Sequence, residues 1–305
     1  MELRQLAAIL AVADNGTFSG AADALGTVQS NVSTHVARLE RELGAPLFDR
    51  SRGALTEEGA AAVARARRVL AEIEALVADV AAVRNVYTGH VRLGMIGTTA
   101  RWLAPRMLAV VAERHPGVHL GVVEGSSAEL TERLLAGRLD LAVTLVPVTD
   151  ADVDGQRLFD EDVVLVVART DPLAARESID PAELRAIPLL LPVTGTPFRE
   201  ELDHALGRGL QAKAELDGVR LIASLTFDGH GPALLPATAV PDFLRDQWVR
   251  VAVRGLPRRR VGVVIRRRGL LSAPARAVRE LLLEIVSAHV GTSGDSGVYP
   301  PADPV

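Results

Sequence analysis

An apolar row with the spacing of a coiled coil constrains this chain more than any other feature. Between residues 57 and 87, apolar side chains recur at alternating intervals of three and four residues. The row consists of Val63, Ala66, Leu70, Ile73, Val77 and Val80. This pattern predicts one long helix whose apolar seam needs a partner helix. We favour a second copy of the chain as that partner. The alternative is packing on the next domain of the same chain.

The residues before that helix predict three short helices in a helix-turn-helix arrangement. In the third of them, which ends at Gly44, one apolar stripe consists of Val32, Val36, Leu39 and Leu43. The opposite face carries short polar groups and arginines, namely Ser30, Thr34, Ala37, Arg38 and Arg41, with Asn31 and Ser33 on the flanks. Such a face can enter the major groove of DNA, where Asn, Gln and Arg hydrogen-bond to base edges. A solvated helix face is the simpler alternative.

Arginines also flank a short glycine turn after the third helix. Arg50 and Arg52 stand beside Gly53, which predicts a β-wing whose arginines contact phosphates or the minor groove. Thr56 then caps the long helix. Residues 1–60 hold five arginines against eight acidic residues, a net charge of −3. Because a generic basic footprint is missing, DNA binding must depend on the local arginines and on dimerisation.

From residue 90 to 290, short β-rich runs alternate with helical ones. This alternation predicts two α/β units with mainly parallel, doubly wound sheets. The segment 291–305 is polar and rich in Gly and Pro, so we expect a disordered tail. The chain contains no cysteine, which excludes disulfides, thiolate metal sites and a cysteine nucleophile. We expect neither a metal nor a cofactor.

Targeting and membrane signals are missing from the sequence. No apolar run reaches the roughly 18 residues of a membrane span. The first residues lack the basic region and the cleavage site of a signal peptide. We therefore expect a soluble cytoplasmic protein that does not bind membranes.

Candidate effector residues follow or flank the predicted strands, because ligands of open α/β sheets bind beyond the carboxyl ends of the strands. These candidates are Thr98, Thr99, Thr144, Thr194, Thr196, Phe198, Phe227, Asp228 and His230. Thr196 and Pro197 form a good N-cap and N1 pair, so a positive helix end would face the ligand. Hydroxyls beside helix ends suit a small carboxylate or a neutral metabolite, and Asp228 disfavours a dicarboxylate. Ordinary helix capping is the alternative for each threonine.

The N-terminal stretch FSGAADALGTVQSNVSTHVARLERELGAPLFDR, followed by LTEEG, resembles the LysR-type transcriptional regulators. Weaker similarities to the effector domain of that family lie in HVRLGMIGT, LLAGRLDLAVT and LTFDGHGPALLP. The resemblance implies that the recognition helix contacts DNA through Gln29, Ser30, Asn31, Ser33, Thr34 and Arg38, and the wing through Arg50 and Arg52. It also implies a two-lobed effector domain similar to periplasmic binding proteins. The chain departs from the family pattern at Val28 and Ser30, where Ser and Pro are usual, and its wing is about two residues shorter.

We therefore predict an α+β protein of several domains. These are a winged helix-turn-helix (1–58), a linker and dimerisation helix (59–88), an effector domain (89–290) and the tail (291–305). The effector domain would comprise lobe I (about 89–160 and 266–290) and lobe II (about 161–265).

The predicted function is sequence-specific transcriptional regulation modulated by a small molecule bound between the lobes. The expected partners are promoter DNA, the effector, further copies in a homodimer or homotetramer, and RNA polymerase. A cytoplasmic solute-binding protein, or an enzyme that uses Asp228 and His230, is the alternative.

Overall fold

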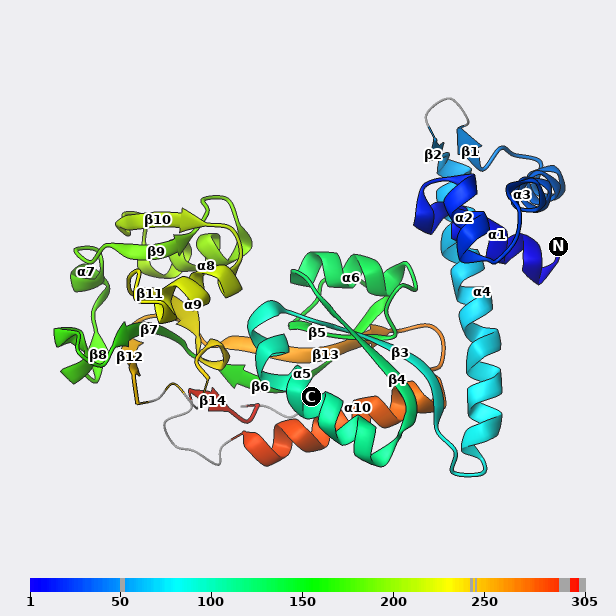
Figure 1. Ribbon diagram of the computed structural model, residues 1–305. Coiled ribbons are helices and arrows are strands. Elements are labelled where there is room, and N and C mark those ends of the chain that lie inside the picture. The colour runs from blue at the N-terminus through cyan, green and yellow to red at the C-terminus, as the bar shows by residue number, and fades with distance from the viewer. Residues whose placement is uncertain (50–52, 242–243, 245, 291–296, 302–305) are drawn as a thin grey trace.

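The computed structural model describes residues 1–49, 53–241, 244, 246–290 and 297–301. The chain forms a helical head, one long helix and two six-stranded sheets (Figure 1). The first sheet lies between the long helix and the second sheet. Within the described ranges, no helix combines the length and apolar character needed to cross a membrane.

The head is a three-helix bundle with a two-stranded wing. Its elements are α1 (Leu3–Asn15), α2 (Phe18–Ala24), α3 (Gln29–Leu43), β1 (Phe48–Asp49) and β2 (Ala54–Leu55). Gly16 and Gly44 end α1 and α3 with positive φ angles of 71° and 73°, a conformation that glycine adopts without steric cost. The predicted stripe of α3 is buried at Val32, Val36 and Leu39. The fourth position of the stripe, Leu43, is 44% exposed.

The long helix α4 (Glu57–Ala82) joins the head to the first sheet. The Thr56 hydroxyl caps it by accepting from the Gly59 N–H at 2.9 Å. The helix is shorter than the predicted 57–87, because the chain turns at Asn85, where φ is +57°. Arg67 binds Asp14 of the head at 2.6 Å, and Arg68 donates to the Leu135 carbonyl at 2.7 Å.

The first sheet has the strand order β14-β6-β13-β5-β3-β4. Its strands are β3 (Thr88–Met95), β4 (Gly117–Glu124), β5 (Leu141–Leu145), β6 (Val153–Glu161), β13 (Arg259–Arg266) and β14 (Val298–Tyr299). The helices packed with it are α5 (Gly97–Arg114), α6 (Ser127–Leu135) and α10 (Ala273–His289). Strands β3, β4 and β5 are parallel, whereas β13 runs antiparallel to β5 and β6. The sheet is therefore mixed rather than mainly parallel.

The second sheet has the order β10-β9-β11-β7-β12-β8 and is also mixed. Its strands are β7 (Val163–Ala168), β8 (Ser178–Ile179), β9 (Leu189–Pro192), β10 (Ala212–Leu216), β11 (Ala233–Pro236) and β12 (Trp248–Val253). Its helices are α7 (Pro181–Leu184), α8 (Pro197–Leu206) and α9 (Val219–Phe227), with short 3-10 turns η1 (Pro172–Ala175) and η2 (Ala237–Ala239). An aliphatic core built on Leu165, Leu191, Leu202 and Leu234 lies inside this unit.

The chain crosses between the sheets twice, from β6 to β7 through Asp162 and from β12 to β13 through residues 254–258. The predicted two-lobed α/β architecture is confirmed (Figure 1). The lobe boundary predicted near residue 266 is wrong, because β13 pairs with β5 and β6 and so belongs to the first lobe from Arg259 onward.

The prediction of a disordered tail over 291–305 is wrong for the part that the structure describes. Val298 and Tyr299 form β14, which pairs with Glu161 and Asp160 of β6. Val298 is 7% exposed and belongs to the core of the first lobe. This burial of apolar surface offsets the entropy of ordering a short segment. Residues 291–296 and 302–305 lie outside the described residues.

Candidate DNA interface and effector site

Helix α3 presents its predicted polar face to the surface. Five of the six predicted DNA contacts on this helix are exposed, and Ser33 is half-buried. The exposed ones are Gln29, Ser30, Asn31, Thr34 and Arg38. Thr34 donates to the Ser30 carbonyl at 2.8 Å, and the Asn31 amide donates to the Thr27 hydroxyl at 3.1 Å. In the described part of the chain Arg38 forms no ion pair, so its guanidinium can bind a phosphate or a guanine edge.

Two features beside α3 complete the candidate interface. The wing strands β1 and β2 pair through Phe48 with Leu55 and Asp49 with Ala54. The predicted wing contacts Arg50 and Arg52 lie outside the described residues. Val28, the N-cap of α3, is 59% exposed and has no side-chain capping bond. An exposed aliphatic group at this position has the chemistry to pack against a thymine methyl.

The predicted apolar seam of α4 divides into two halves. Ala66 is buried in the head core, and Val63 and Leu70 pack against that core. Ile73, Val77 and Val80 are 36%, 67% and 60% exposed. The first half of the seam is thus covered by the chain's own head, and only the second half is open to another partner.

An apolar groove of about 450 Å³ lies between α1, α3 and α4. Its lining includes Leu6, Leu43, Leu47, Ala62 and Val69. Val69 is 44% exposed and lies one turn before Ile73 on α4. The groove therefore continues into the exposed half of the seam and forms one apolar surface with it.

The predicted effector residues of the first lobe lie together. Thr98 and Thr99 occupy the first turn of α5, directly after β3, and Thr144 lies on the adjacent parallel strand β5. All three are at least 96% buried. The Thr144 hydroxyl donates to the Leu145 carbonyl at 3.2 Å, and the Thr99 hydroxyl has no hydrogen-bond partner among the described residues.

The predicted effector residues of the second lobe do not lie together. Thr194 and Thr196 follow β9, at the carboxyl edge of the sheet. The Thr194 hydroxyl donates to Glu215 at 2.9 Å, and the Thr196 hydroxyl donates to the Val193 carbonyl at 2.8 Å. Phe198 is 8% exposed within the aliphatic core, with the Arg259 guanidinium 5.2 Å from its ring centre. Phe198 is therefore a core residue rather than one open to a ligand.

Asp228 and His230 occupy the opposite edge of the second sheet, contrary to the sequence analysis. They precede β11, which runs parallel to β9 and pairs with Leu190 near the beginning of that strand. Lys213 donates to the His230 carbonyl at 2.5 Å. At this edge Asp228 does not disfavour a second negative charge on an effector bound at the carboxyl ends of the strands. Phe227 lies on α9 and stacks edge-on against Trp248, with centres 5.6 Å apart.

A charged bridge joins the carboxyl edges of the two sheets. Arg220, in the first turn of α9, forms an ion pair with Glu124 at the end of β4. Gly97 lies under this bridge, and a Cβ at Gly97 would come within 2.7 Å of a Glu124 carboxylate oxygen. Arg101 of α5 lies 5.6 Å from the ring centre of Phe227 and forms no ion pair in the described part of the chain. Partial burial and the nearby Arg220 lower the pKa of Arg101.

Sequence reasoning missed this bridge because it did not recognise α9. The helix begins after Gly218 without a side-chain cap, so the usual sign of a helix N-terminus is absent. A helix predicted here would have placed Arg220 just after β10, at the expected edge of the sheet.

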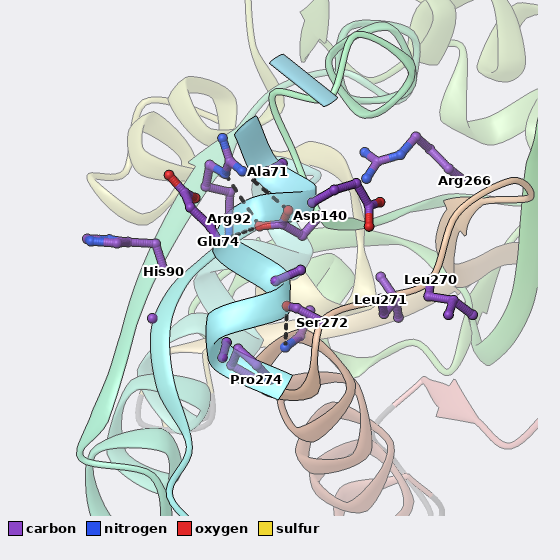
Figure 2. A pocket seen from close by; sticks show the side chains of 15 residues that line it. Ala71, Glu74, His90, Arg92, Asp140, Arg266, Leu270, Leu271, Ser272 and Pro274 are labelled. Atoms are coloured by element: carbon purple, nitrogen blue, oxygen red, sulfur yellow. Dashed lines mark hydrogen bonds and ion pairs between the residues drawn. The ribbon is translucent and has the colours of Figure 1, made fainter. Parts of the chain in front are cut away.

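A small pocket of about 50 Å³ lies where α4 meets the first lobe (Figure 2). Figure 2 shows Arg92 and Asp140 facing each other there, and the Arg92 N–H donates to Asp140 at 2.7 Å. Arg266 donates to the Leu134 and Leu139 carbonyls at 2.9 and 2.8 Å, and burial lowers its pKa. The pocket has room for a few waters, so it is a joint between helix and lobe rather than an effector site. No cluster of metal-ligating side chains occurs among the described residues.

Comparisons with known proteins agree with this arrangement. Residues 3–60 match the family described as "Bacterial regulatory helix-turn-helix protein, lysR family". Residues 84–287 match the "LysR substrate binding domain". A probable hydrogen peroxide-inducible genes activator of Mycobacterium avium is 34% identical over 93% of this chain and 94% of its own.

Solved structures extend the likeness to the whole chain. A full-length OxyR variant from Pseudomonas aeruginosa, with one cysteine replaced by aspartate, has a TM-score of 0.74 and 27% identity over 94% of each chain. Full-length CbnR in complex with its target DNA has a TM-score of 0.65 over 94% of this chain and 99% of its own. At 23% identity, the CbnR likeness concerns the fold. These relatives regulate transcription and are not enzymes. The chain belongs to the LysR family of DNA-binding transcriptional regulators.

Proposed function

We propose that this regulator reads a promoter half-site with the exposed face of α3, pairs with a second copy through α4, and responds to a small anion bound between its lobes. The observation that carries the proposal is the amphipathic α3, whose apolar side is buried in the head and whose Thr34 and Arg38 side is exposed. A promoter-bound regulator of this kind acts in the cytoplasm, where it can contact RNA polymerase.

A DNA-shift assay with the fragment flanking the protein's own coding region tests the DNA interface. Thr34→Ala and Arg38→Ala should each weaken DNA binding at least about tenfold. A good base contact contributes on the order of 1–3 kcal/mol, and each substitution removes one such contact from both half-sites of a dimer. Arg208→Ala is the matched control, since it removes an equally exposed arginine far from the head. Parent-like binding by both head variants would contradict the assignment.

Self-association is supported by the apolar surface that runs from the groove beside Leu43 and Leu47 along α4 to Val80. Val77 and Val80 are more than half exposed on a helix that is bonded to the head through Arg67 and to α10 through Asp79. An open apolar surface of this length is unfavourable in water. A second copy can cover it symmetrically, which places two heads on two half-sites. Pairs of such dimers would give the homotetramer.

The effector is proposed to be a small carboxylate, with a neutral metabolite as the other option. Arg220 forms an ion pair with Glu124, and Arg101 lies near enough to Arg220 for the two positive charges to interact. The buried hydroxyls of Thr99 and Thr144 lie at the same edge of the first sheet. An anion could replace Glu124 as the partner of Arg220 and so change how the lobes are held.

The response would be non-covalent. Relatives of this chain are named for induction by hydrogen peroxide, and peroxide reacts reversibly with cysteine thiolates. None of the 305 residues of this chain is cysteine. We therefore propose that it binds its effector and does not react with peroxide through a thiol.

Thermal unfolding of the full chain with matched pairs of small carboxylic acids and their amides tests the effector class. At least one acid should raise the unfolding midpoint more than its amide, because a ligand that binds only the folded state stabilises it. Arg220→Gln should abolish that increase, whereas Arg208→Gln should retain it. Equal effects of acids and amides would contradict an anionic effector.

A further inference from the structure

The two crossings between the lobes meet a third segment of the chain. Asp162 is the residue between β6 and β7, and Arg258 directly precedes β13. Any change in the angle between the lobes must change the backbone of these crossings. Residues 297–299, far away in the sequence, lie against both of them.

Asp162 is the centre of this arrangement. Its backbone N–H donates to the Gly297 carbonyl at 2.8 Å, and its own carbonyl accepts from the Ala237 N–H of η2 at 2.9 Å. Its carboxylate accepts from the Arg258 Nε at 3.0 Å and from the Tyr299 hydroxyl at 2.7 Å. Asp162 therefore connects the two crossings with the C-terminal segment and with η2, which follows β11 of the second sheet and packs into the core of the first lobe.

Each residue of the C-terminal segment makes a different contact. The ring of Tyr299 stacks on Arg258, whose guanidinium carbon lies 3.6 Å from the ring centre. Val298 is buried in the core of the first lobe. Gly297 has a φ of +66°, and a Cβ at this position would come within 2.9 Å of the Ala237 Cβ. The segment thus packs closely against the first-lobe core and against both crossings.

We propose that residues 297–299 form a hinge staple that holds both crossings together and limits how far the lobes can rotate. The ion pair of Arg258 and Asp162 alone would restrain the hinge weakly, because these side chains are 49% and 33% exposed. Burial of Val298, the cation–π contact and the Tyr299 hydrogen bond act on the same hinge and strengthen it. An effector that changes the lobe arrangement then works against the staple, whatever its chemistry.

Hydrogen exchange on the full chain tests the staple directly. Tyr299→Ala should speed exchange of the Asp162 and Ala237 amides at least about tenfold, because local opening of the hinge becomes easier. Tyr299→Phe keeps the ring and should give a smaller increase at the same two amides. Tyr87→Phe, which changes the other tyrosine of the chain, is the matched control and should leave them unchanged. Parent-like protection of both amides in Tyr299→Ala would overturn the proposal.

A spectroscopic titration provides an independent readout. In a Tyr87→Phe background, Tyr299 is the sole tyrosine. Its hydrogen bond to Asp162 raises the pKa of Tyr299, so tyrosinate absorbance should develop above the ordinary value of about 10. Asp162→Ala should return the pKa of Tyr299 to that value. An ordinary pKa that is unaffected by Asp162→Ala would show that the staple is not formed in solution.

Discussion

At the scale of single residues, a buried ionic cluster beside the hinge is the most unusual feature. Glu161 is fully buried, accepts from the Thr238 hydroxyl at 2.7 Å and lies 3.2 Å from Arg259. Arg259 also approaches Glu201 at 3.6 Å. Burial raises the pKa of Glu161 although Arg259 opposes it, and burial also raises the pKa of Glu201. Arg259 is therefore the ion-pair partner of two carboxyl groups, Glu161 and Glu201, that burial keeps from full solvation.

Arg259→Leu should destabilise the effector domain by about 3 kcal/mol at pH 8, because it leaves a buried carboxylate unpaired. A raised folded-state pKa means that stability from Glu161 is complete below the unfolded value and is lost as pH rises through the folded value. The deficit should therefore be smaller at pH 5 than at pH 8, because the raised pKa favours protonation of Glu161 as the pH falls.

Urea unfolding followed by the fluorescence of Trp102 and Trp248, one in each lobe, measures this difference. Arg260→Leu, at the exposed neighbouring position, should change stability by less than about 0.5 kcal/mol. An Arg259→Leu deficit of equal size at both pH values would refute the assignment of the raised pKa to Glu161.

At the scale of elements, α4 connects the head with the first lobe. Arg67 and Arg68 are neighbours on this helix, yet one binds Asp14 of the head and the other the Leu135 carbonyl of the first lobe. Asp79 accepts from the Ala273 N–H at the beginning of α10 at 2.5 Å. The helix is thus fixed to both parts, and a shift of the first lobe can reach the head through it.

The exposed half of the α4 seam should carry the dimer. Val77→Asp combined with Val80→Asp should weaken dimerisation at least about 100-fold, because it replaces buried apolar contacts with unpaired charge. Size-exclusion chromatography with light scattering measures the mass at micromolar concentration. Leu270→Asp, at an exposed apolar position off this helix, should remain dimeric. A dimer that survives the double substitution would exclude this surface.

Gly59 fixes the beginning of α4 against the segment that leads into the wing. A Cβ at this position would lie 1.9 Å from the Leu47 carbonyl oxygen, which no backbone adjustment accommodates without cost. Gly59→Ala should therefore destabilise the head by about 3 kcal/mol, seen as faster hydrogen exchange throughout α1 and α3. Gly121→Ala, where the nearest atom is 3.9 Å away, should leave the head unaffected. Unchanged exchange in Gly59→Ala would contradict the packing.

Local patterns predicted the head well and the lobes less well. The face of α3 followed from helical spacing alone, since Val32, Val36 and Leu39 face inward and Arg38 outward. Asp228 and His230 were misplaced because the edge on which they lie depends on the parallel pairing of β9 with β11. The polar composition of the tail gave no sign of β14, because Val298 and Tyr299 are ordered by contacts with the first-lobe core and with Asp162. Such long-range pairings leave no periodic signal in the sequence.

At the scale of the whole molecule, binding depends on geometry more than on charge. The protein has a net charge of −4, and its first 60 residues have a net charge of −3. Long-range attraction to phosphates is therefore weak. If the chain pairs through α4 as proposed, specific affinity comes from two recognition helices held at a fixed separation. In the proposed dimer, a change in lobe arrangement would alter that separation and hence the choice of site.

Selection from a library of random DNA duplexes at low ionic strength tests this account most directly. The full chain should enrich sites with dyad symmetry, whose half-sites lie on one face of the duplex a whole number of helical turns apart. The combined Thr34→Ala and Arg38→Ala variant should enrich none. Failure of the parent protein to enrich any sequence, or enrichment of the same sites by the variant, would contradict the claim that α3 reads promoter DNA.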